Sequence, residues 1–264
     1  MPQGSFGRIK AWNDFTAIPP HTAADTVPLA NGSLLGGGWS LHGVNEGTAT
    51  AVVDEPGGVI EIVSDTADND NVFISSGVWS PADGGMTCEF RIKIPTSVAT
   101  TRASAWCGFT ETLSVATPVM PFETATTTTT YNGSGGMVGF GFDSDATSIT
   151  WRFAAGDGGA ALATVDSTGT AGTALGIDTG ATITADRWWV FRVNVGSNGL
   201  AEGWFGDAVN GEAGSQQLVG RTTAALGLSD QFHATVGQEN RSAANEELDV
   251  DYAFAEGYRD WNAD

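Results

Sequence analysis

The chain has 264 residues, 41% of them hydrophobic and 36 of them glycine, which favours an all-β domain of short strands around a real core. Its net charge of −20 would repel phosphate backbones and anionic membranes, so the composition argues against nucleic-acid and membrane binding. No segment approaches the ~20 apolar residues that cross a bilayer, and the first residues lack the apolar centre of a signal peptide.

Residues 1–45 differ from the rest of the chain, because they are rich in proline, glycine and small side chains and show weak periodicity. Proline removes a backbone donor and favours extended chain, so the sequence predicts an extended N-terminal arm ahead of a domain at residues 46–264. Two interpretations stay open, a disordered tail and an arm that clamps a neighbouring molecule. In the second, Pro19 and Pro20 are candidates for contact with a partner or a glycan.

The first hairpin signal follows the arm, where two apolar runs flank the Glu-Pro-Gly-Gly turn of residues 55–58. The next clear strand, "MTCEFRIKIP" at residues 86–95, has side chains that alternate between two faces. Its predicted dry side consists of Met86, Cys88, Phe90, Ile92 and Ile94, and its wet side of Thr87, Glu89, Arg91 and Lys93. That wet side could serve chemistry, sugar binding or contact with another protein.

The two cysteines, Cys88 and Cys107, fall at inward positions of their strands and are predicted to be buried free thiols. A disulfide between them is conceivable only if their strands are neighbours.

Residues 115–136 are rich in threonine and interrupted by proline, which predicts a long excursion between strands. Tyr131, near the end of this excursion, is a candidate for partner or glycan contact. The following hairpin, "MVGFGFDSDATSITWRFAAGDGG", turns Val138, Phe140 and Phe142 inward. Gly139 and Gly141 leave its other face bare for another segment to approach.

The clearest hairpin is "DRWWVFRVNVGSNGLAEGWFGD", with its turn at residues 197–199. Trp189, Phe191, Val193 and Val195 are predicted to face the core. Trp188 and Trp204 lie opposite the main apolar sets of their strands, and are therefore candidates for a sugar platform or a protein contact. Together these alternating strands predict a two-sheet antiparallel jelly-roll sandwich.

A family resemblance is carried by "GGVIEIVSDTADNDNVFISSGVWSPADGGMTCEFRIKIP", "SAWCGFTET", "DRWWVFRVNVGSNGLAEGWFGD" and "LDVDYAFAEG". This pattern, over about residues 55–255, resembles the concanavalin A-like (laminin-G-like) jelly roll. More narrowly, "DNDN" followed by "CEFRIKI" resembles structural proteins of tailed bacteriophages that are encoded near the major capsid protein. The resemblance implies the jelly-roll fold and a place in a virion, although this fold hosts lectins, hydrolases and coat proteins.

The strand "EELDVDY" is the sharpest enzymatic candidate, because some glycoside hydrolases of this fold carry Glu-x-Asp-x-Glu on one strand face. Here Glu247, Asp249 and Asp251 share a predicted face. Asp251 is one methylene shorter than the expected glutamate, and the strand lies at the C-terminal end rather than mid-chain. An outward polar row is the favoured interpretation, and the chain is predicted not to be an enzyme.

The loop "DTADNDN" is rich in oxygen ligands of the kind calcium prefers, with Asp65, Asp68 and Asp70 as the metal candidates. The EF-hand spacing is absent, and short side chains that bond their own backbone explain such a loop equally simply. The sequence therefore predicts no cofactor, with calcium as the alternative.

The favoured function is a non-enzymatic phage protein that decorates or cements the outer surface of a capsid through protein–protein contacts. Its predicted partner is the major capsid protein, its predicted assembly a homo-oligomer with a trimer as the specific guess, and its predicted location the outer capsid surface after synthesis in the host cytoplasm. The alternatives are a lectin-like adhesin that binds surface glycans and, third, a protein related to glycoside hydrolases.

Overall fold

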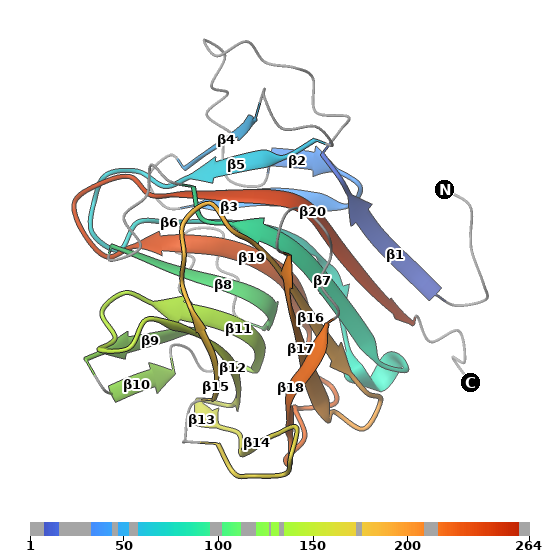
Figure 1. Cartoon of the computed structure of the whole chain (residues 1–264). Helices are drawn as coiled ribbons and strands as arrows, with labels where there is room; N and C mark the ends of the chain where they lie inside the picture. Colours follow the sequence, from blue (N-terminus) through green and yellow to red (C-terminus); the bar gives the residue numbers. More distant parts are fainter. Residues whose placement is uncertain are drawn as a thin grey trace.

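The computed structural model describes residues 8–15, 33–43, 47–52, 58–95, 102–111, 120–126, 128–131, 135–172, 176–208 and 216–258. Across these ranges the regular structure is β-strand, apart from one 3₁₀ turn, η1 (Pro81–Asp83). None of the helical structure in this part of the chain is long and apolar enough to cross a membrane. The predicted all-β, two-sheet jelly-roll sandwich is confirmed, and its two layers are seen in Figure 1.

Sheet A holds the wet-sided strand β7 near its centre. In spatial order its strands are β14 (Thr164–Asp166), β18 (Gln217–Thr222), β17 (Ala201–Ala208), β16 (Trp188–Val195), β7 (Met86–Lys93), β20 (Glu247–Tyr258), β5 (Ile60–Val63) and β4 (Thr48–Ala51). A ninth strand, β1 (Arg8–Asn13), pairs antiparallel with the second half of β20.

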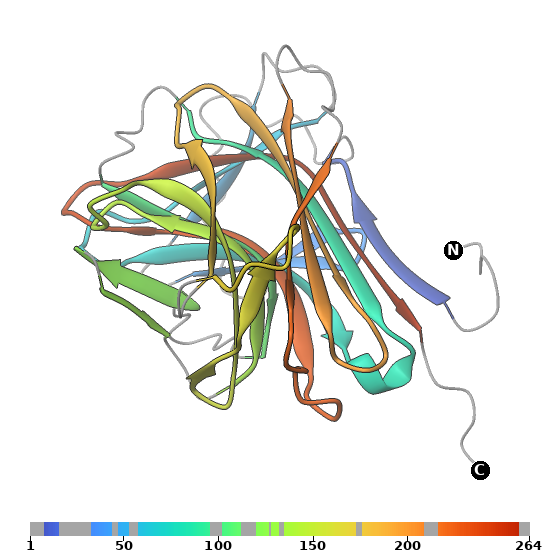
Figure 2. The same ribbon diagram turned by 60° about the horizontal axis from the view of Figure 1, so that its bottom comes forward.

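Sheet B faces sheet A across the core, as the turned view in Figure 2 shows. Its strands are, in order, β13 (Ala160–Ala161), β12 (Thr150–Asp157), β11 (Met137–Asp143), β8 (Ala103–Thr110), β19 (Phe232–Asn240), β6 (Asn71–Trp79), β3 (Trp39–Gly43) and β2 (Ser33–Gly36), with β15 (Ile177–Thr182) beside β12. A separate hairpin, β9 (Phe122–Ala125) and β10 (Thr128–Tyr131), lies over the outer side of sheet B.

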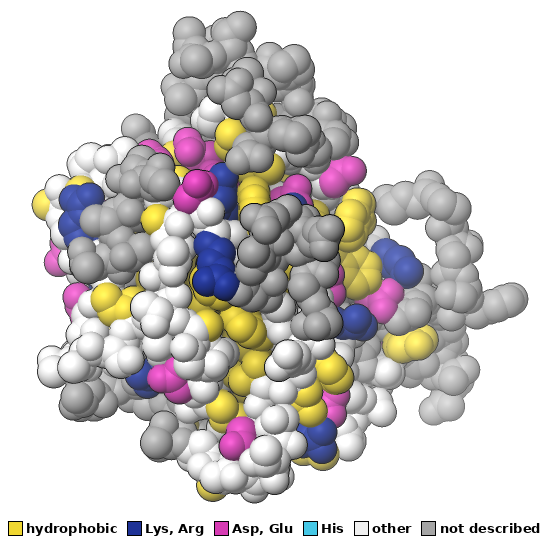
Figure 3. Space-filling model, viewed as in Figure 1, with side chains coloured by type: hydrophobic (Ala, Val, Ile, Leu, Met, Phe, Trp, Pro, Cys, Tyr) yellow, Lys and Arg dark blue, Asp and Glu magenta, His cyan; other side chains and the backbone are white. Residues whose placement is uncertain are grey.

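The core between the sheets is rich in aromatic side chains. Trp151 of sheet B packs against Phe191 of sheet A, with ring centroids 4.4 Å apart, and meets Phe142 edge-on at 4.8 Å. All three side chains are fully buried. Burying one such ring contributes about 2–3 kcal/mol, so these contacts hold the two layers together. Hydrophobic side chains also reach the surface in a band between β15 and β17, which Figure 3 shows.

The predicted hairpins form, because their period-two patterns bury one face of each strand. β4 pairs with β5, β11 with β12, and β16 with β17, all antiparallel. The five predicted dry residues of β7 are all at most 2% exposed. Cys88 and Cys107 are buried free thiols as predicted; their strands, β7 and β8, belong to opposite sheets.

The described part of the segment predicted as an N-terminal arm, residues 8–15 and 33–43, forms strands that pair with the two sheets. β1 forms a six-residue register with β20, and β3 pairs with β6 in sheet B. The side-chain amide of Asn13 donates hydrogen bonds to the carbonyl oxygens of Leu35 and Gly36, which links β1 to β2. Residues 8–13 and 33–43 are therefore parts of the sandwich, and a boundary at residue 46 does not separate them from it. Pro19 and Pro20 lie outside the described residues.

Candidate functional site

The outer face of sheet A brings together side chains from strands far apart in the sequence. Residues that oppose each other in an antiparallel pair share a face of the sheet. Glu89 of β7 lies opposite Arg192 of β16 and Phe254 of β20. Arg91 lies two residues further along β7, opposite Tyr252. The wet side predicted for β7 is thus the centre of a continuous polar and aromatic surface.

An aromatic shelf, made of Trp12, Tyr252 and Phe254, borders this surface. The indole of Trp12 stacks on the ring of Tyr252, with centroids 5.2 Å apart and planes 20° apart. Phe254 is tilted against the same indole at 6.0 Å. Trp12 remains 51% exposed, so one side of a large flat ring is open to a ligand. Near β1, at the right of Figure 3, hydrophobic, acidic and basic side chains lie next to one another.

Glu89 is a carboxylate fixed beside the shelf. The hydroxyl of Tyr252 donates a hydrogen bond to Glu89 Oε1 at 2.7 Å, and Gln216 Nε2 donates to Oε2 at 3.1 Å. Burial and the bond to Glu89 raise the pKa of Tyr252, so its hydroxyl stays protonated and remains a donor. The carboxylate oxygens, with two lone pairs each, keep capacity for further donors.

Two ion pairs continue along the same face of β7, two and four residues beyond Glu89. Arg91 bonds Asp251, and Lys93 Nζ lies 3.2 Å from Asp249 Oδ2. Both cations also lie over the ring of Trp188, with Arg91 at 4.5 Å and Lys93 at 4.9 Å from its centroid. Cation–π contact of this kind fixes the ring and covers one of its sides. Trp188, a candidate for a sugar platform or a protein contact, is half-buried and has both cations against its ring. Trp204, the second candidate, lies opposite Arg192 and is half-buried as well.

The acidic row of β20 has structural partners. A register shift between Val250 and Tyr252 places Asp251 beside Arg91, while Asp249 pairs with Lys93. Each of these two carboxylates therefore has a cation beside it, which gives both a structural role within the sheet. Glu61 of β5, directly opposite Asp249, has its pKa raised from 4.5 to about 7 by burial and then by the nearby Glu247 and Asp249.

The oxygen-rich loop before β6 bonds to itself. Asp65 accepts the backbone N–H of Thr66 at 2.7 Å, and Asp70 accepts that of Ala67 at 3.1 Å. Arg241 donates to Asn69 at 3.2 Å. Among the described residues no group of three or more His, Cys, Asp or Glu side chains could hold a metal ion. The geometry matches turn chemistry, and calcium binding by Asp65, Asp68 and Asp70 stays a prediction.

Tyr131 does not belong to the outer face of sheet A. It packs on a second apolar cluster on the outer side of sheet B, which includes Trp106, Phe122 and Met137. Burial, followed by the charges of Asp157 and Glu111, raises its pKa. Tyr131 therefore does not share a surface with Trp188 and Trp204, the other candidate contact residues, because those two lie on sheet A.

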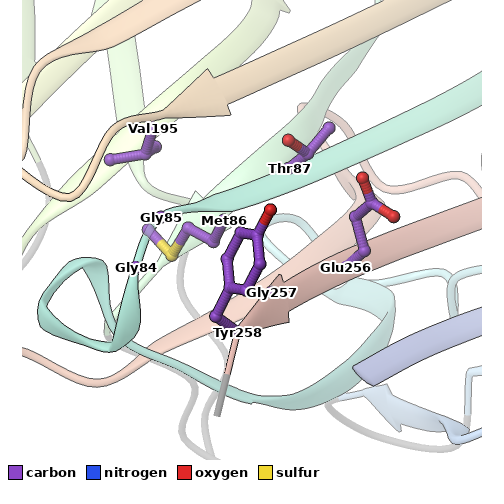
Figure 4. Close-up of a pocket in the computed structure, with 8 residues that line it drawn as sticks. All are labelled: Gly84, Gly85, Met86, Thr87, Val195, Glu256, Gly257 and Tyr258. Atoms are coloured by element: carbon purple, nitrogen blue, oxygen red, sulfur yellow. The ribbon is translucent and has the colours of Figure 1, made fainter. Parts of the chain in front are cut away.

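A small hollow continues the outer face at the end of β20, as the close-up in Figure 4 shows. It is lined by Gly84, Gly85, Met86, Thr87, Val195, Glu256, Gly257 and Tyr258. Glu256 lies opposite Thr87 in the β7–β20 register and opposite Lys10 in the β1–β20 register. The hollow and the aromatic shelf therefore share strand β20, and β1 pairs with this part of β20.

No protein-family model matches the chain, and no curated protein matches it in sequence. Its fold is similar to that of a solved protein of unknown function, SO2946 from Shewanella oneidensis MR-1, with a TM-score of 0.55 and 14% identity over 97% of this chain and 88% of that one. The carbohydrate recognition domain of Emp47p gives a TM-score of 0.49 and 13% identity, covering 90% and 97% of the two chains. Lectin I from Ulex europaeus, solved with the methyl glycoside of α-L-fucose, also gives 0.49, with 10% identity over 95% and 98%. At such identities the likeness concerns the fold.

Proposed function

We propose that this chain binds a carbohydrate on the outer face of sheet A, without chemical turnover. The observation that carries the proposal is the exposed indole of Trp12, stacked on Tyr252 and next to the fixed carboxylate of Glu89. A sugar ring offers apolar C–H groups on its face and hydroxyl donors at its rim. A flat ring beside a positioned acceptor complements both properties.

The supporting contacts keep this arrangement in place before a ligand arrives. Tyr252 and Gln216 hold the two oxygens of Glu89, and Tyr252 also supports the indole from below. Fixing side chains in advance reduces the entropy lost when a ligand binds.

Binding to a panel of immobilised oligosaccharides, measured for the wild type and two variants, tests the proposal. Trp12→Ala removes the platform and is expected to weaken binding at least tenfold, about 1.4 kcal/mol. Val78→Ala removes an exposed apolar side chain of sheet B, 58% exposed, and is expected to leave binding unchanged. A wild-type protein that binds no member of the panel contradicts the proposal, as does a Trp12→Ala variant that binds normally.

Capsid decoration is the second candidate. Leu34 on β2 is 83% exposed and Val78 on β6 is 58% exposed, and such apolar side chains on sheet B are available for protein contact while sheet A binds sugar. The sequence resemblance to tailed-phage structural proteins favours the major capsid protein as partner and a trimer as the assembled form. Quantitative mass spectrometry of purified virions tests the role, and native mass spectrometry of the isolated chain tests the trimer. Particles that lack this chain contradict the decoration proposal.

A further inference from the structure

We propose that the hollow at the end of β20 binds the ammonium group of an amino sugar, so that the preferred ligand is a glycan carrying free amines. This inference rests on the proposed sugar-binding function and names the class of sugar. Its two recognition elements are the carboxylate of Glu256 and the ring of Tyr258, both of which line the hollow in Figure 4.

Glu256 already accepts a primary ammonium group. Lys10 Nζ lies 3.5 Å from Glu256 Oε2, while the side chains of Lys10 and Glu256 are 56% and 9% exposed. A carboxylate buried to this degree is stabilised by a cation, and the lysine reaches it on a flexible stem from the solvent side. The net charge of −20 adds a long-range attraction for cationic ligands. A ligand amine can therefore replace Lys10 at the same acceptor.

Tyr258 supplies the aromatic wall. Tyr258 is 46% exposed as a residue, and a cation held over an aromatic ring gains electrostatic attraction. Gly84, with φ of +119°, packs directly against this side chain, because a Cβ there would lie 3.0 Å from Tyr258 Cβ and 3.1 Å from its Cγ. The position of the Tyr258 ring in the wall of the hollow thus depends on the absence of a side chain at residue 84.

The position of the hollow connects it to the aromatic shelf. Glu256 lies two residues after Phe254 on β20, and Lys10 lies two residues before Trp12 on β1. Two residues of a strand span about 7 Å, and both pairs share the outer face. A sugar stacked on Trp12 therefore places a neighbouring unit of the same chain at the hollow.

Titration with oligomers of β-1,4-linked glucosamine and with their N-acetylated equivalents, at mildly acidic pH, tests the inference. The wild type is expected to bind the amine form about tenfold more tightly, the value of one charge-assisted contact. Glu256→Gln is expected to remove this difference while binding of the N-acetyl form persists. Lys10→Met is expected to strengthen binding of the amine form only, since the competing internal ammonium is gone.

Each outcome separates the two proposals. Equal wild-type affinity for the two forms, or weaker amine binding in Lys10→Met, overturns the ammonium site and leaves sugar binding standing. No binding of either form, combined with no binding across the oligosaccharide panel, overturns sugar binding itself. Loss of both ligands in Glu256→Gln, with an unchanged thermal midpoint, shows that Glu256 contacts the sugar without reading its amine, and also overturns the inference.

Discussion

The indole of Trp12 lies almost parallel to the ring of Tyr252, with 5.2 Å between the ring centroids. The two residues are 240 positions apart in the sequence and meet because β1 pairs with the end of β20. Tyr252 also donates its hydroxyl to Glu89, so the stacked pair and the carboxylate form one unit. Replacing any one of these three residues is expected to change the positions of the other two side chains.

Tyr252→Phe separates the two roles of this tyrosine. The ring stack on Trp12 is retained, while Glu89 loses the donor at 2.7 Å. We expect the free energy of unfolding to fall by about 1 kcal/mol, the usual net value of one hydrogen bond, and sugar affinity to fall several-fold. Chemical denaturation and ligand titration measure the two effects. Unchanged affinity would show that the orientation of Glu89 does not matter for the ligand.

The ion pair between Arg91 and Asp251 is expected to couple more strongly than that between Lys10 and Glu256. The side chains of Arg91 and Asp251 are 16% and 17% exposed, whereas Lys10 is 56% exposed. Solvent around Lys10 screens its pair with the buried Glu256 to about 1 kcal/mol, while two largely buried charges are expected to couple by about 2–3 kcal/mol. Double-mutant cycles with Arg91→Met and Asp251→Asn, and with Lys10→Met and Glu256→Gln, measure both coupling energies. Equal couplings would contradict this ranking.

Glu61 is expected to make the protein less stable as pH rises from about 4.5 to about 7. Its pKa is about 7 in the folded state and 4.5 when unperturbed, so between these values the folded state binds more protons than the unfolded state. Stability from this group is therefore greatest below pH 4.5 and is lost as pH rises to about 7. Glu61→Gln should flatten this slope and stabilise the protein by about 1 kcal/mol at pH 8, after allowance for solvent screening. Thermal midpoints from pH 4 to 8 check the sign; a steeper slope in the variant contradicts it.

Local patterns were sufficient to predict much of the fold. The strand at residues 86–95 and the hairpin of β16 and β17 were predicted because apolar residues recur at every second position and a turn signal joins neighbouring strands. The inward placement of Phe191 and Val193 follows from the same alternation. These features depend on residues close together in the chain, which one sequence displays directly.

The site depends on pairings that the sequence does not display. Residues 8–13 alternate between Ile9 and Ala11 on one side and Lys10 and Trp12 on the other, but the run is short and precedes a proline-rich segment, which together favour an arm. No residue near this strand in the sequence indicates that it pairs with β20. The sequence alone therefore does not identify Trp12 as a site residue. The cations over Trp188 were missed for the same reason, because they come from β7 through the register with β16.

Gly141→Ala is expected to disturb the hairpin of β9 and β10. A Cβ at residue 141 would lie 2.3 Å from Phe122 and 2.8 Å from the carbonyl oxygen of Ala105, so the bare face predicted for β11 is filled by an aromatic ring. Overpacking of this kind costs about 1–3 kcal/mol. Chemical denaturation should show that Phe122→Leu recovers part of the loss. Gly158→Ala, where no atom lies within 4 Å but φ is +55°, is the control for backbone strain alone. A Gly141→Ala variant as stable as the wild type contradicts the contact.

The two thiols are expected to resist labelling until the protein unfolds. Cys88 and Cys107 are both 0% exposed, and burial raises the pKa of each above 9.0, which keeps the unreactive thiol form. Cys107 also donates to the carbonyl oxygen of Phe140 at 3.7 Å. A thiol reagent added at pH 8 should therefore label neither residue in the folded protein and both in denaturant, at a rate set by opening of the sandwich. Cys88→Ala and Cys107→Ala assign the two signals; rapid labelling of one site under native conditions would show that its strand opens locally.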